Sequence, residues 1–260
     1  MLAETIPRYE FPATSLHELA LLSDSNQMLV PSLASTPEVA VAVTEYCNGL
    51  CAPLPRRVLD HQNYTAANVS NPNMMISTLE AKTLSWIARD RKAKRILEIG
   101  CFSGFSALVW AECVPSSGGE VISLEIDKEM IAMANKAIRE QDMQDMITVI
   151  PGPAAETLQT LEGEFDLIFL DADKAGYITY FETILARKLL APNGVILADN
   201  TLYSGLVCIR NEHNPARHET TSVAVSDYLI AFNKHVAEDS RVDQIILPLF
   251  DGLSMIRLIS

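Results

Sequence analysis

The sequence predicts an α/β fold: a mostly parallel β-sheet with helices on both faces, an antiparallel hairpin at its C-terminal end, and an N-terminal helical cap. Short apolar runs alternate with segments of helical periodicity from about residue 79 onward, a pattern typical of a parallel sheet. The last two apolar runs flank Phe250-Asp251-Gly252-Leu253, and Asp-Gly between strand-like runs favours a hairpin. A chain of 260 residues, 48% of them hydrophobic, can bury one sizeable core.

Residues 1–70 differ in character from the rest of the chain. Helical periodicity predicts helices over Ser15–Leu29 and Pro37–Gly49, and several prolines interrupt the segment around them. We therefore expect an N-terminal helical cap over residues 1–70, which can also contribute to dimerisation, and a single α/β domain over residues 71–260.

The α/β region alternates between helices and strands until the final hairpin. Helical periodicity predicts helices at Leu79–Arg89, Ser103–Cys113 and Lys128–Glu140. Apolar runs of strand length predict seven strands, at Arg95–Ile99, Glu120–Leu124, Ile147–Ile150, Leu167–Leu170, Val195–Leu197, Gln244–Leu249 and Ser254–Ile259.

The charge balance argues against several classes of protein. Asp and Glu number 33 against 20 Lys and Arg, and no basic stripe indicates nucleic-acid binding. No apolar stretch approaches the ~20 residues of a membrane span, and we see no signal-peptide pattern. The odd cysteine count, without framework spacing, favours a reduced, cytoplasmic protein. Cys47 and Cys51, four residues apart, are interpreted as buried small side chains on one helix face rather than as a redox pair.

A glycine-rich turn follows the first predicted strand, in the run from Glu98 through Gly100 to Gly104. Such a turn lets a ligand approach the backbone at the carboxyl edge of a sheet, although a plain tight turn explains the glycines equally well. The spacing differs from the dinucleotide fingerprint G-x-G-x-x-G, which argues against a nicotinamide oxidoreductase. The carboxylate of Glu98 would repel a pyrophosphate and suits a cationic ligand group.

The second predicted strand ends near Glu125, which lies 25 residues after Gly100. An acidic residue at this position can accept hydrogen bonds from both hydroxyls of a ribose. The alternative is a solvated loop acid. The glycine turn and this acid together favour an adenosyl ligand.

Polar residues also follow the fourth and fifth predicted strands: Asp171 after one, and Asp199 and Asn200 after the other. Neighbouring parallel strands place their C-terminal tips together, so these side chains should converge. Three oxygen donors suit a hard cation such as Mg²⁺, Mn²⁺ or Ca²⁺, with positions left for water and substrate. Solvated strand-end acids are the alternative interpretation, and no His/Cys cluster suggests zinc.

Taken together, the motifs LEIGCFSGFSAL, SLEID, GPAAETL, FLDADKAGY and LADNTLYSG resemble the cation-dependent O-methyltransferases of the caffeoyl-CoA and catechol type. The resemblance covers roughly Met75 to Ser260 and is most specific in DADK followed by ADN. The stretch VAVAVTEYCNGLCAPLP is similar to a fungal branch of that family. The resemblance implies a Rossmann-like class I methyltransferase fold and S-adenosylmethionine as cofactor.

The resemblance also implies roles for individual residues. Lys174 would be the base, with Asp171 beside it in the catalytic machinery, and Asp171, Asp199 and Asn200 would bind the metal. One departure is visible, since many relatives carry Gln-Gly-Gln where this chain has Glu80-Ala81-Lys82-Thr83. The implied cofactor-binding residues are Ser77, Glu98, Gly100, Ser106, Glu125, Ala154, Asp171 and Tyr180.

The implied reaction is an in-line transfer of a methyl group to a hydroxyl of a small aromatic, phenol- or catechol-like secondary metabolite. Coordination to a divalent ion lowers the pKa of a bound oxygen acid, and a nearby cation favours the neutral amine of Lys174. The expected substrate walls are residues 202–218, with Tyr203 and Ser204 nearest the metal, and residues 56–73. Similar enzymes are commonly homodimers, and we expect one here.

The acidic charge and the few basic residues of the cap predict a substrate without a coenzyme A handle, unless Arg56, Arg57, Arg210 or Arg217 supplies the charge. The alternative function is a methyltransferase-like protein that binds the cofactor but catalyses another biosynthetic step.

Overall fold

The computed structural model describes residues 37–259, and the chain divides into two compact units, Met1–Leu50 and Cys51–Ser260. Helix α2 (Pro37–Leu50) belongs to the first unit and confirms the helix predicted over Pro37–Gly49. Pro37 opens it, where the locked φ of proline is tolerated, and Glu38 in the first turn complements the helix dipole. The helix predicted over Ser15–Leu29 lies outside the described residues.

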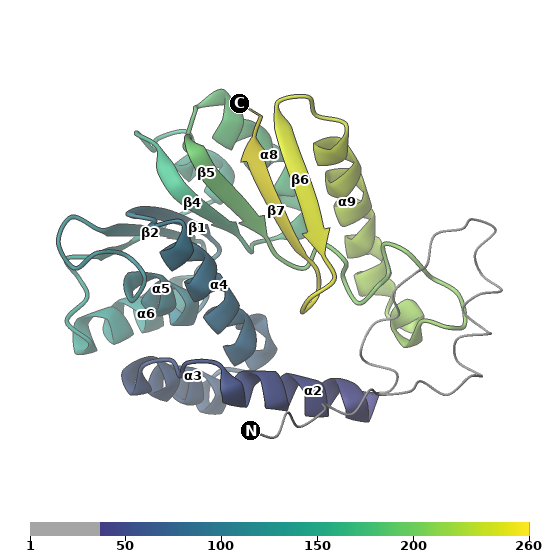
Figure 1. The fold of residues 1–260 in the computed structure, drawn as a ribbon, viewed down its shortest axis with the longest axis horizontal. Helices are drawn as coiled ribbons and strands as arrows, with labels where there is room; N and C mark the ends of the chain where they lie inside the picture. Colours follow the sequence, from purple (N-terminus) through teal and green to yellow (C-terminus); the bar gives the residue numbers. More distant parts are fainter. Residues whose placement is uncertain (1–36, 260) are drawn as a thin grey trace, which may run out of the picture. The chain divides into compact units, whose positions relative to one another are not determined.

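The second unit is built on a seven-stranded sheet in the order β3-β2-β1-β4-β5-β7-β6 (Figure 1). Neighbouring strands from β3 to β5 pair in parallel, and β7 pairs antiparallel with both β5 and β6. The predicted α/β fold, with its seven strands and C-terminal antiparallel hairpin, is confirmed. The strands are β1 (Arg95–Ile99), β2 (Glu120–Glu125), β3 (Ile147–Pro151), β4 (Phe165–Leu170), β5 (Leu190–Ala198), β6 (Val242–Leu247) and β7 (Leu253–Leu258).

Strand β5 is the least accurately predicted strand. It begins at Leu190, five residues before the predicted start at Val195, and its register against β4 shifts between Phe165 and Leu167. The intervening Ala-Pro-Asn-Gly has the composition of a turn, and here that composition marks an irregular strand start rather than a loop.

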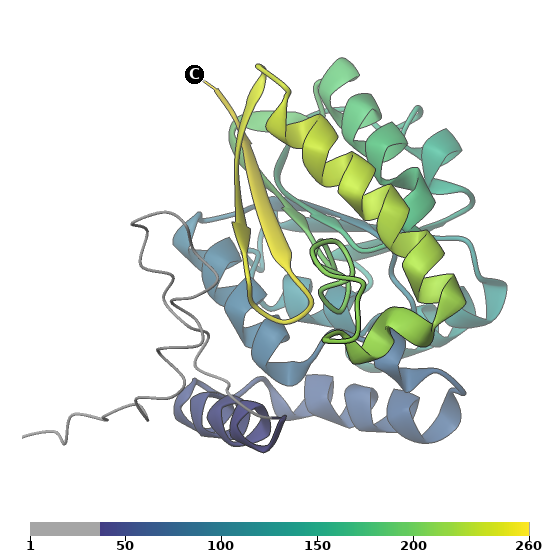
Figure 2. The same ribbon diagram turned by 90° about the vertical axis from the view of Figure 1, so that its right-hand side faces the viewer.

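Helices cover both faces of this sheet (Figures 1 and 2). Trp110 packs edge-on against Phe169 in the core on one face, and Phe232 packs against Tyr177 and Phe181 in the core on the other. The first face carries α4 (Thr78–Asp90), α5 (Phe105–Ala111) and α6 (Lys128–Glu140); the second carries α7 (Ala154–Thr157), α8 (Tyr177–Ala186) and α9 (Thr220–Ala237).

Helix α3 (Arg56–Asn68) was not expected from the sequence, where residues 56–73 were treated only as a wall of the site. It contacts α5 and buries Val58, so residues 51–70 fold with the sheet. The role of residues 1–70 as a cap and dimerisation segment stays a prediction. Three 3₁₀ turns complete the described chain: η1 (Pro72–Met74), η2 (Lys174–Gly176) and η3 (Pro215–His218).

The cysteines correct one prediction. All five are free thiols, but Cys47 and Cys51 are exposed rather than buried. The prediction was wrong because α2 ends at Leu50, so Cys51 lies beyond the helix and shares no helical face with Cys47. Across residues 37–259, no helix combines the length and apolarity that a membrane crossing requires.

Candidate active site

The tips of β4 and β5 bring Asp171, Lys174 and Asp199 together. Leu170 pairs with Ala198 in register, so the residues that follow them leave the sheet side by side. Lys174 Nζ lies 3.0 Å from Asp171 Oδ1 and donates a hydrogen bond of 2.7 Å to the hydroxyl of Tyr177. The single proton of that hydroxyl is shared between the carbonyl oxygens of Leu170 and Asp199, which lie 3.0 and 3.1 Å away. Tyr177, which we did not predict, therefore holds both strand tips and the lysine in one arrangement.

Asn200 turns the chain away from β5 in a left-handed conformation, with φ of 58°. Its backbone N–H donates to Asp199 Oδ1 at 2.7 Å, which orients that carboxyl group. Asparagine adopts this conformation more readily than most residues. The sequence prediction that the polar residues of β4 and β5 meet is therefore realised for the two aspartates and the backbone of Asn200.

Glu80 is a site residue that sequence reasoning missed. It is 4% exposed and lies at the third position of α4, where it forms a reciprocal capping box with Ser77. Its carboxyl group lies within hydrogen-bonding reach of that of Asp199 and is also close enough to Asp171 to feel its charge. Glu80 Oε1 is buried without a hydrogen-bond partner among the described residues. The departure from the family motif at Glu80 was the available signal.

These buried acids perturb one another. Burial, and then the nearby charges of Asp199 and Asp171, raise the pKa of Glu80 to about 9. Burial and the charge of Asp171 raise the pKa of Asp199 to about 7, although Lys174 and the Asn200 N–H oppose the shift. Burial raises the pKa of Tyr177 well above its usual range, so its hydroxyl stays protonated. The carboxyl groups of Glu80, Asp171 and Asp199 thus have one ammonium group near them among the described residues, that of Lys174. This imbalance favours a further proton or cation among the three acids.

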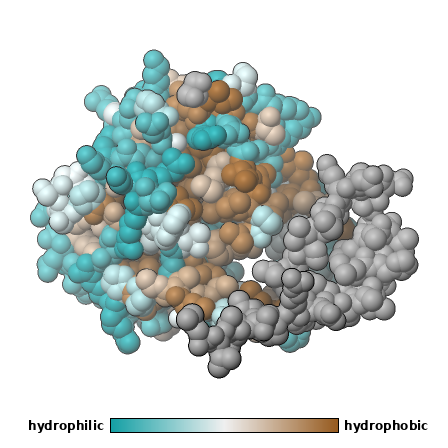
Figure 3. All heavy atoms as spheres, viewed as in Figure 1, coloured by the Kyte–Doolittle hydropathy of each residue, from teal (hydrophilic) through white to brown (hydrophobic). Residues whose placement is uncertain are grey.

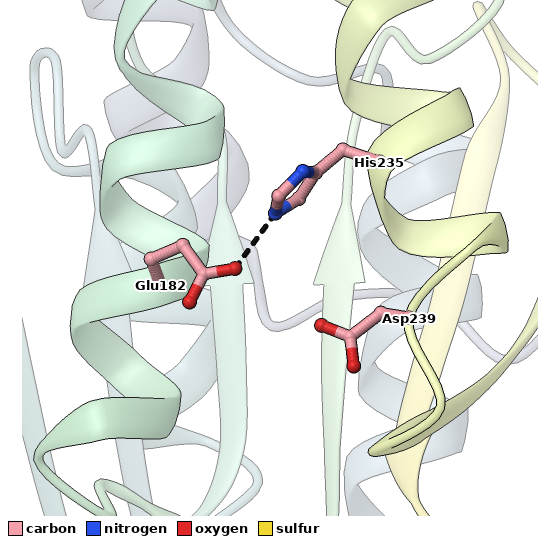
Figure 4. Close-up of side chains that lie close together, drawn as sticks. All are labelled: Glu182, His235 and Asp239. Atoms are coloured by element: carbon pink, nitrogen blue, oxygen red, sulfur yellow. Dashed lines mark hydrogen bonds and ion pairs between the residues drawn. The ribbon is translucent and has the colours of Figure 1, made fainter.

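A second acidic cluster lies elsewhere, between α8 and the end of α9 (Figure 4). Glu182, His235 and Asp239 place ligand atoms within 4.8 Å of one another, the only such trio of His, Cys, Asp or Glu found over residues 37–259. However, the Arg241 guanidinium contacts Glu182 Oε1 at 2.7 Å and also pairs with Asp239. The position of a cation is already filled by an arginine, so we interpret this cluster as a surface ion-pair network.

The glycine-rich turn is in direct contact with the chain at the end of β4. Gly100 has a φ of 99°, and a Cβ atom there would lie 2.0 Å from the carbonyl oxygen of Asp171. Gly104 has a φ of 91°, and its Cβ would lie 2.8 Å from the Cβ of Ala134. Both glycines are required by backbone conformation and by close approach. The turn predicted to hold the cofactor and the tip of β4 are therefore one packed unit.

Glu125 lies at the end of β2, as predicted, and its carboxylate is oriented by main-chain donors. Oε2 accepts from the N–H groups of Cys101 and Phe102, and Oε1 accepts from those of Ile126 and Asp127. Since a carboxylate offers about four acceptor sites, a ribose bound here as predicted would have to share or displace some of these bonds.

Glu98 is fully buried, with its carboxyl group enclosed by protein. It accepts hydrogen bonds from Trp110 Nε1 at 2.9 Å and from Ser123 Oγ at 2.7 Å, and Ser106 also bonds to it. Burial raises the pKa of Glu98 to about 7, against the effect of these donors. Its predicted contact with the cofactor, and that of Ser106, stays a prediction.

The remaining residues assigned to the cofactor lie at three different helix starts. Ser77 Oγ caps α4 by accepting from the Glu80 N–H, and Ala154 is the first residue of α7, next to the end of β2. The Tyr180 hydroxyl donates to Asp173, and its ring lies so close to Gly176 that a Cβ there would clash. Asp173 therefore pairs with Tyr180, whereas Lys174 pairs with Asp171.

The loop that carries Tyr203 and Ser204 is hydrogen-bonded to the turn between β6 and β7. Both residues have positive φ angles, and the N–H groups of Leu202 and Tyr203 donate to the carbonyl of Asp251. The N–H of Ser204 donates to the Asp251 carboxylate. The charge of Lys174 opposes the rise in the pKa of Asp251 that burial causes, which places this carboxyl group near the lysine. Asp251 is a third residue at this site, after Tyr177 and Glu80, that the sequence did not reveal.

Helix α3 contacts the glycine-rich turn through His61 and Thr65. His61 Nε2 lies 2.8 Å from the carbonyl oxygen of Ser103, and Thr65 Oγ1 lies 3.0 Å from Ser103 Oγ. Burial lowers the pKa of His61, so the neutral imidazole donates to this carbonyl. Residues before the first strand thus support the turn predicted to hold the cofactor.

Comparisons with known proteins agree with this architecture. A family model described as O-methyltransferase matches residues 54–259. O-methyltransferase ankF from Aspergillus thermomutatus is 39% identical over 225 residues, 85% of this chain and 94% of the relative. Caffeoyl-CoA O-methyltransferase 1 from Eucalyptus globulus is 32% identical over 192 residues, 72% of this chain and 76% of the relative.

The SAH-bound crystal structure of the Podospora anserina methyltransferase PaMTH1 superposes with a TM-score of 0.84, at 39% identity, and covers 89% of this chain and 100% of that one. The fold is thus that of class I S-adenosylmethionine-dependent methyltransferases. The protein belongs to the O-methyltransferase family, and the predicted resemblance to its caffeoyl-CoA and fungal members is confirmed.

Proposed function

We propose that the protein transfers the methyl group of S-adenosylmethionine to a hydroxyl of a small phenol- or catechol-like metabolite, with a divalent cation at the strand tips and Lys174 as the base. The observation that carries this proposal is the meeting of Asp171, Asp199 and Lys174 beside the glycine-rich turn. The family supplies the methyl-transfer chemistry, and these three residues suggest how a hydroxyl is activated next to it.

The residues at the strand tips fit a hard divalent cation. Asp171 and Asp199 offer charged oxygen donors, and Asn200 offers an amide oxygen on the adjoining residue. Asp199 is only 3% exposed, and its raised pKa reflects a buried charge that lacks full compensation. A bound divalent cation would act as a Lewis acid that lowers the pKa of a coordinated hydroxyl.

Lys174 is positioned to take a proton from such a hydroxyl. Two of its three N–H directions are used by Asp171 and Tyr177, and its side chain is 11% exposed. The remaining direction is the one left for a substrate. For the amine to act as a base it must first lose a proton, and a cation held by Asp171 and Asp199 would favour that loss.

Cofactor binding is assigned to the neighbouring turn and strand ends. Glu125 would hold the ribose hydroxyls, Gly100 would allow the close approach of the methionine part, and Ala154 would face the adenine. S-adenosylmethionine supplies a methyl group already activated on its sulfonium, so the chain mainly has to align the acceptor oxygen. Ser77 and Tyr180 would border the methionyl part, with Glu98 and Ser106 behind it.

The arginines that could hold a coenzyme A tail are already engaged. Arg56 pairs with Asp60 at 2.8 Å, Arg57 pairs with Glu112, and Arg210 pairs with Asp227 at 2.8 Å. The Arg217 side chain donates to two backbone carbonyls. This supports a free aromatic substrate, bordered by Tyr203 and Ser204, rather than a thioester with several phosphate charges.

A homodimer remains part of the proposal. Figure 3 shows apolar residues gathered over β5, β7 and β6 on the face turned toward the viewer. Ile245 on β6 is 57% exposed, and Met255 lies beside it in register on β7. A second copy would bury this surface, and light scattering at micromolar concentration tests it: a dimer mass supports the proposal and a monomer mass contradicts it.

The deciding experiment is a substrate panel of catechols, hydroxycinnamates and polyketide phenols, assayed for S-adenosylhomocysteine formation with and without chelator. We expect turnover of a free phenol that EDTA abolishes and Mg²⁺ or Mn²⁺ restores. Full activity after rigorous chelation would contradict the cation, and a much higher kcat/KM for caffeoyl-CoA than for every free phenol would contradict the substrate class. Cofactor binding without any methyl product would favour the alternative of a methyltransferase-like protein with another biosynthetic role.

A further inference from the structure

We infer that Glu80 is a fourth oxygen ligand of the cation site, reaching from the first turn of α4 to the carboxyl group of Asp199. The inference rests on the proposed function, because it assigns a ligand to the cation proposed there. It adds a residue from outside the two strand tips, and it ties the segment before the first strand to the chemistry.

The first support is an unpartnered buried oxygen. Glu80 is only 4% exposed, and its Oε1 atom has no hydrogen-bond partner among residues 37–259. A buried carboxylate oxygen without a donor is costly, and natural structures rarely leave one unmet. The oxygen is therefore expected to face a group that the protein itself does not provide.

The second support is the neighbour that Glu80 approaches. The charged groups that act most strongly on Glu80 are Asp199 and then Asp171. Two ionised carboxylates repel each other, so an approach as close as this needs either a shared proton or a cation between them. Lys174 does not fill that place, since its Nζ is bonded to Asp171 and Tyr177.

The third support is that the position of Glu80 is built into the helix. Ser77 Oγ accepts from the Glu80 N–H at 3.1 Å, and Glu80 Oε2 accepts from the Ser77 N–H at 3.4 Å. This capping box holds one carboxyl oxygen, Oε2, at the helix end and leaves the other, Oε1, buried without a partner among the described residues. The capping box thus fixes the main chain at Glu80. Among the described residues only Glu182, His235 and Asp239 place ligand atoms within 4.8 Å of one another, so Glu80, Asp171 and Asp199 have to move closer together to bind one ion.

A fourth protein ligand would change the number of coordination positions that the cation has left for substrate and water. Hard divalent ions such as Mn²⁺ take about six oxygen ligands. With Asp171, Asp199, Asn200 and Glu80 bound, two positions remain, which is the number that two adjacent oxygens of a catechol would occupy. With three protein ligands, three positions remain and one water stays beside a bound catechol.

The test is the substitution Glu80→Gln in the full-length protein, with Mn²⁺ as the probe. Gln at this position preserves the capping box, so the helix end is retained while the charged ligand is lost. We expect Mn²⁺ affinity, measured by isothermal titration, to fall by about tenfold or more, the scale of losses around metal ligands. Water-proton relaxation should show two exchangeable waters on Mn²⁺ in the unsubstituted protein and three in E80Q.

Two further variants separate the outcomes. E182Q makes the same chemical change in the surface cluster that Arg241 fills, and it should leave Mn²⁺ affinity unchanged. D199N removes a ligand of the proposed cation site and should lower affinity. If the unsubstituted protein fails to bind Mn²⁺, the cation of the proposed function is wrong. If D199N loses affinity while E80Q keeps both affinity and water count, only the inference about Glu80 is overturned.

Discussion

The two acidic clusters of this protein have similar residues and opposite electrostatics. In the first cluster, Asp171 and Asp199 at the strand tips lie near Glu80 of α4, Lys174 pairs with Asp171, and burial raises the pKa values of Glu80 and Asp199. Between α8 and α9, the side chains of Glu182 and Arg241 are 39% and 46% exposed. There the guanidinium and His235 lower the pKa of Glu182, and Arg241 lowers that of Asp239.

The difference shows that the proximity of acidic groups is a poor guide to a functional site. The exposed cluster satisfies a distance criterion for metal ligands, yet its charges are already neutralised in water-accessible positions. The buried cluster carries charge that its protein neighbours leave uncompensated, and such perturbed groups mark functional sites more often. The predictions below test this contrast, from the largest expected effect to the smallest.

Asp199→Ala should have the largest effect. Residues that merely orient metal ligands cost about 10–100-fold when removed, so loss of a ligand should lower kcat by at least about 100-fold. Initial rates at saturating Mg²⁺ and cofactor would measure it. Calorimetric binding of S-adenosylmethionine should be retained as the control, and unimpaired turnover would remove Asp199 from the mechanism.

Lys174→Met tests the base. Removal of a general base costs about 10²–10⁴-fold, so kcat should fall within that range while Mn²⁺ affinity is maintained. Tyr177→Phe, which deletes a bond to Lys174 but keeps the ring, should give a smaller loss in kcat. If K174M reduces Mn²⁺ affinity but leaves kcat at saturating metal intact, Lys174 serves the cation rather than the proton.

The two clusters should affect stability with opposite signs of pH dependence. The pKa of Glu80 rises from 4.5 to about 9 and that of Asp199 from 3.8 to about 7 on folding, so the metal-free native state binds more protons than the unfolded state. Their contribution is therefore greatest at acid pH and is lost as pH rises through the folded pKa values. Glu182 and Asp239, with lowered pKa values, stabilise above their unfolded values of 4.5 and 3.8 and lose this effect as pH falls.

Denaturant unfolding of chelator-treated protein between pH 5 and pH 9 would measure this dependence. The free energy of unfolding should decrease more steeply with pH in the unsubstituted protein than in E80Q. Glu98 has a raised pKa as well, so the comparison between the two proteins is the informative quantity. Equal slopes in the two proteins would show that Glu80 has the same pKa in the folded and the unfolded state.

Arg241→Ala should have the smallest effect. Exposed ion pairs contribute about 0–1 kcal/mol, so the free energy of unfolding should fall by no more than about 1 kcal/mol. Turnover and Mn²⁺ affinity should not change, because the cluster lies apart from the strand tips. A marked loss of either would mean that the exposed cluster has a function we have not assigned.

Local patterns were sufficient to predict most of the fold. The run Arg95–Ile99 is apolar and of strand length, and the strand has those bounds; Lys128–Glu140 is likewise a helix over the predicted residues. The strand-end rule also placed Asp171 and Asp199 together, because in-register parallel strands end at the same edge. These features depend on spacing along the chain, which a sequence displays directly.

Other features depend on contacts between distant segments. Glu80 approaches Asp199 across 119 positions of sequence, and helical periodicity shows only that Glu80 lies in the first turn of a helix. The sequence assigned no role to Tyr177, because its link between two carbonyls and a lysine depends on the fold. The start of β5 was misplaced because its Pro-Asn-Gly run has the composition of a turn.

The contact between Gly100 and Asp171 has a consequence for how this protein can vary over time. A Cβ at residue 100 would lie 2.0 Å from the Asp171 carbonyl oxygen, so even alanine would push the tip of β4 away. Any lineage that replaced this glycine would disturb the turn and the strand tip in a single step. If the proposed function holds, diversification toward new acceptors should therefore fall on side chains beyond this junction, such as those at positions 203 and 204.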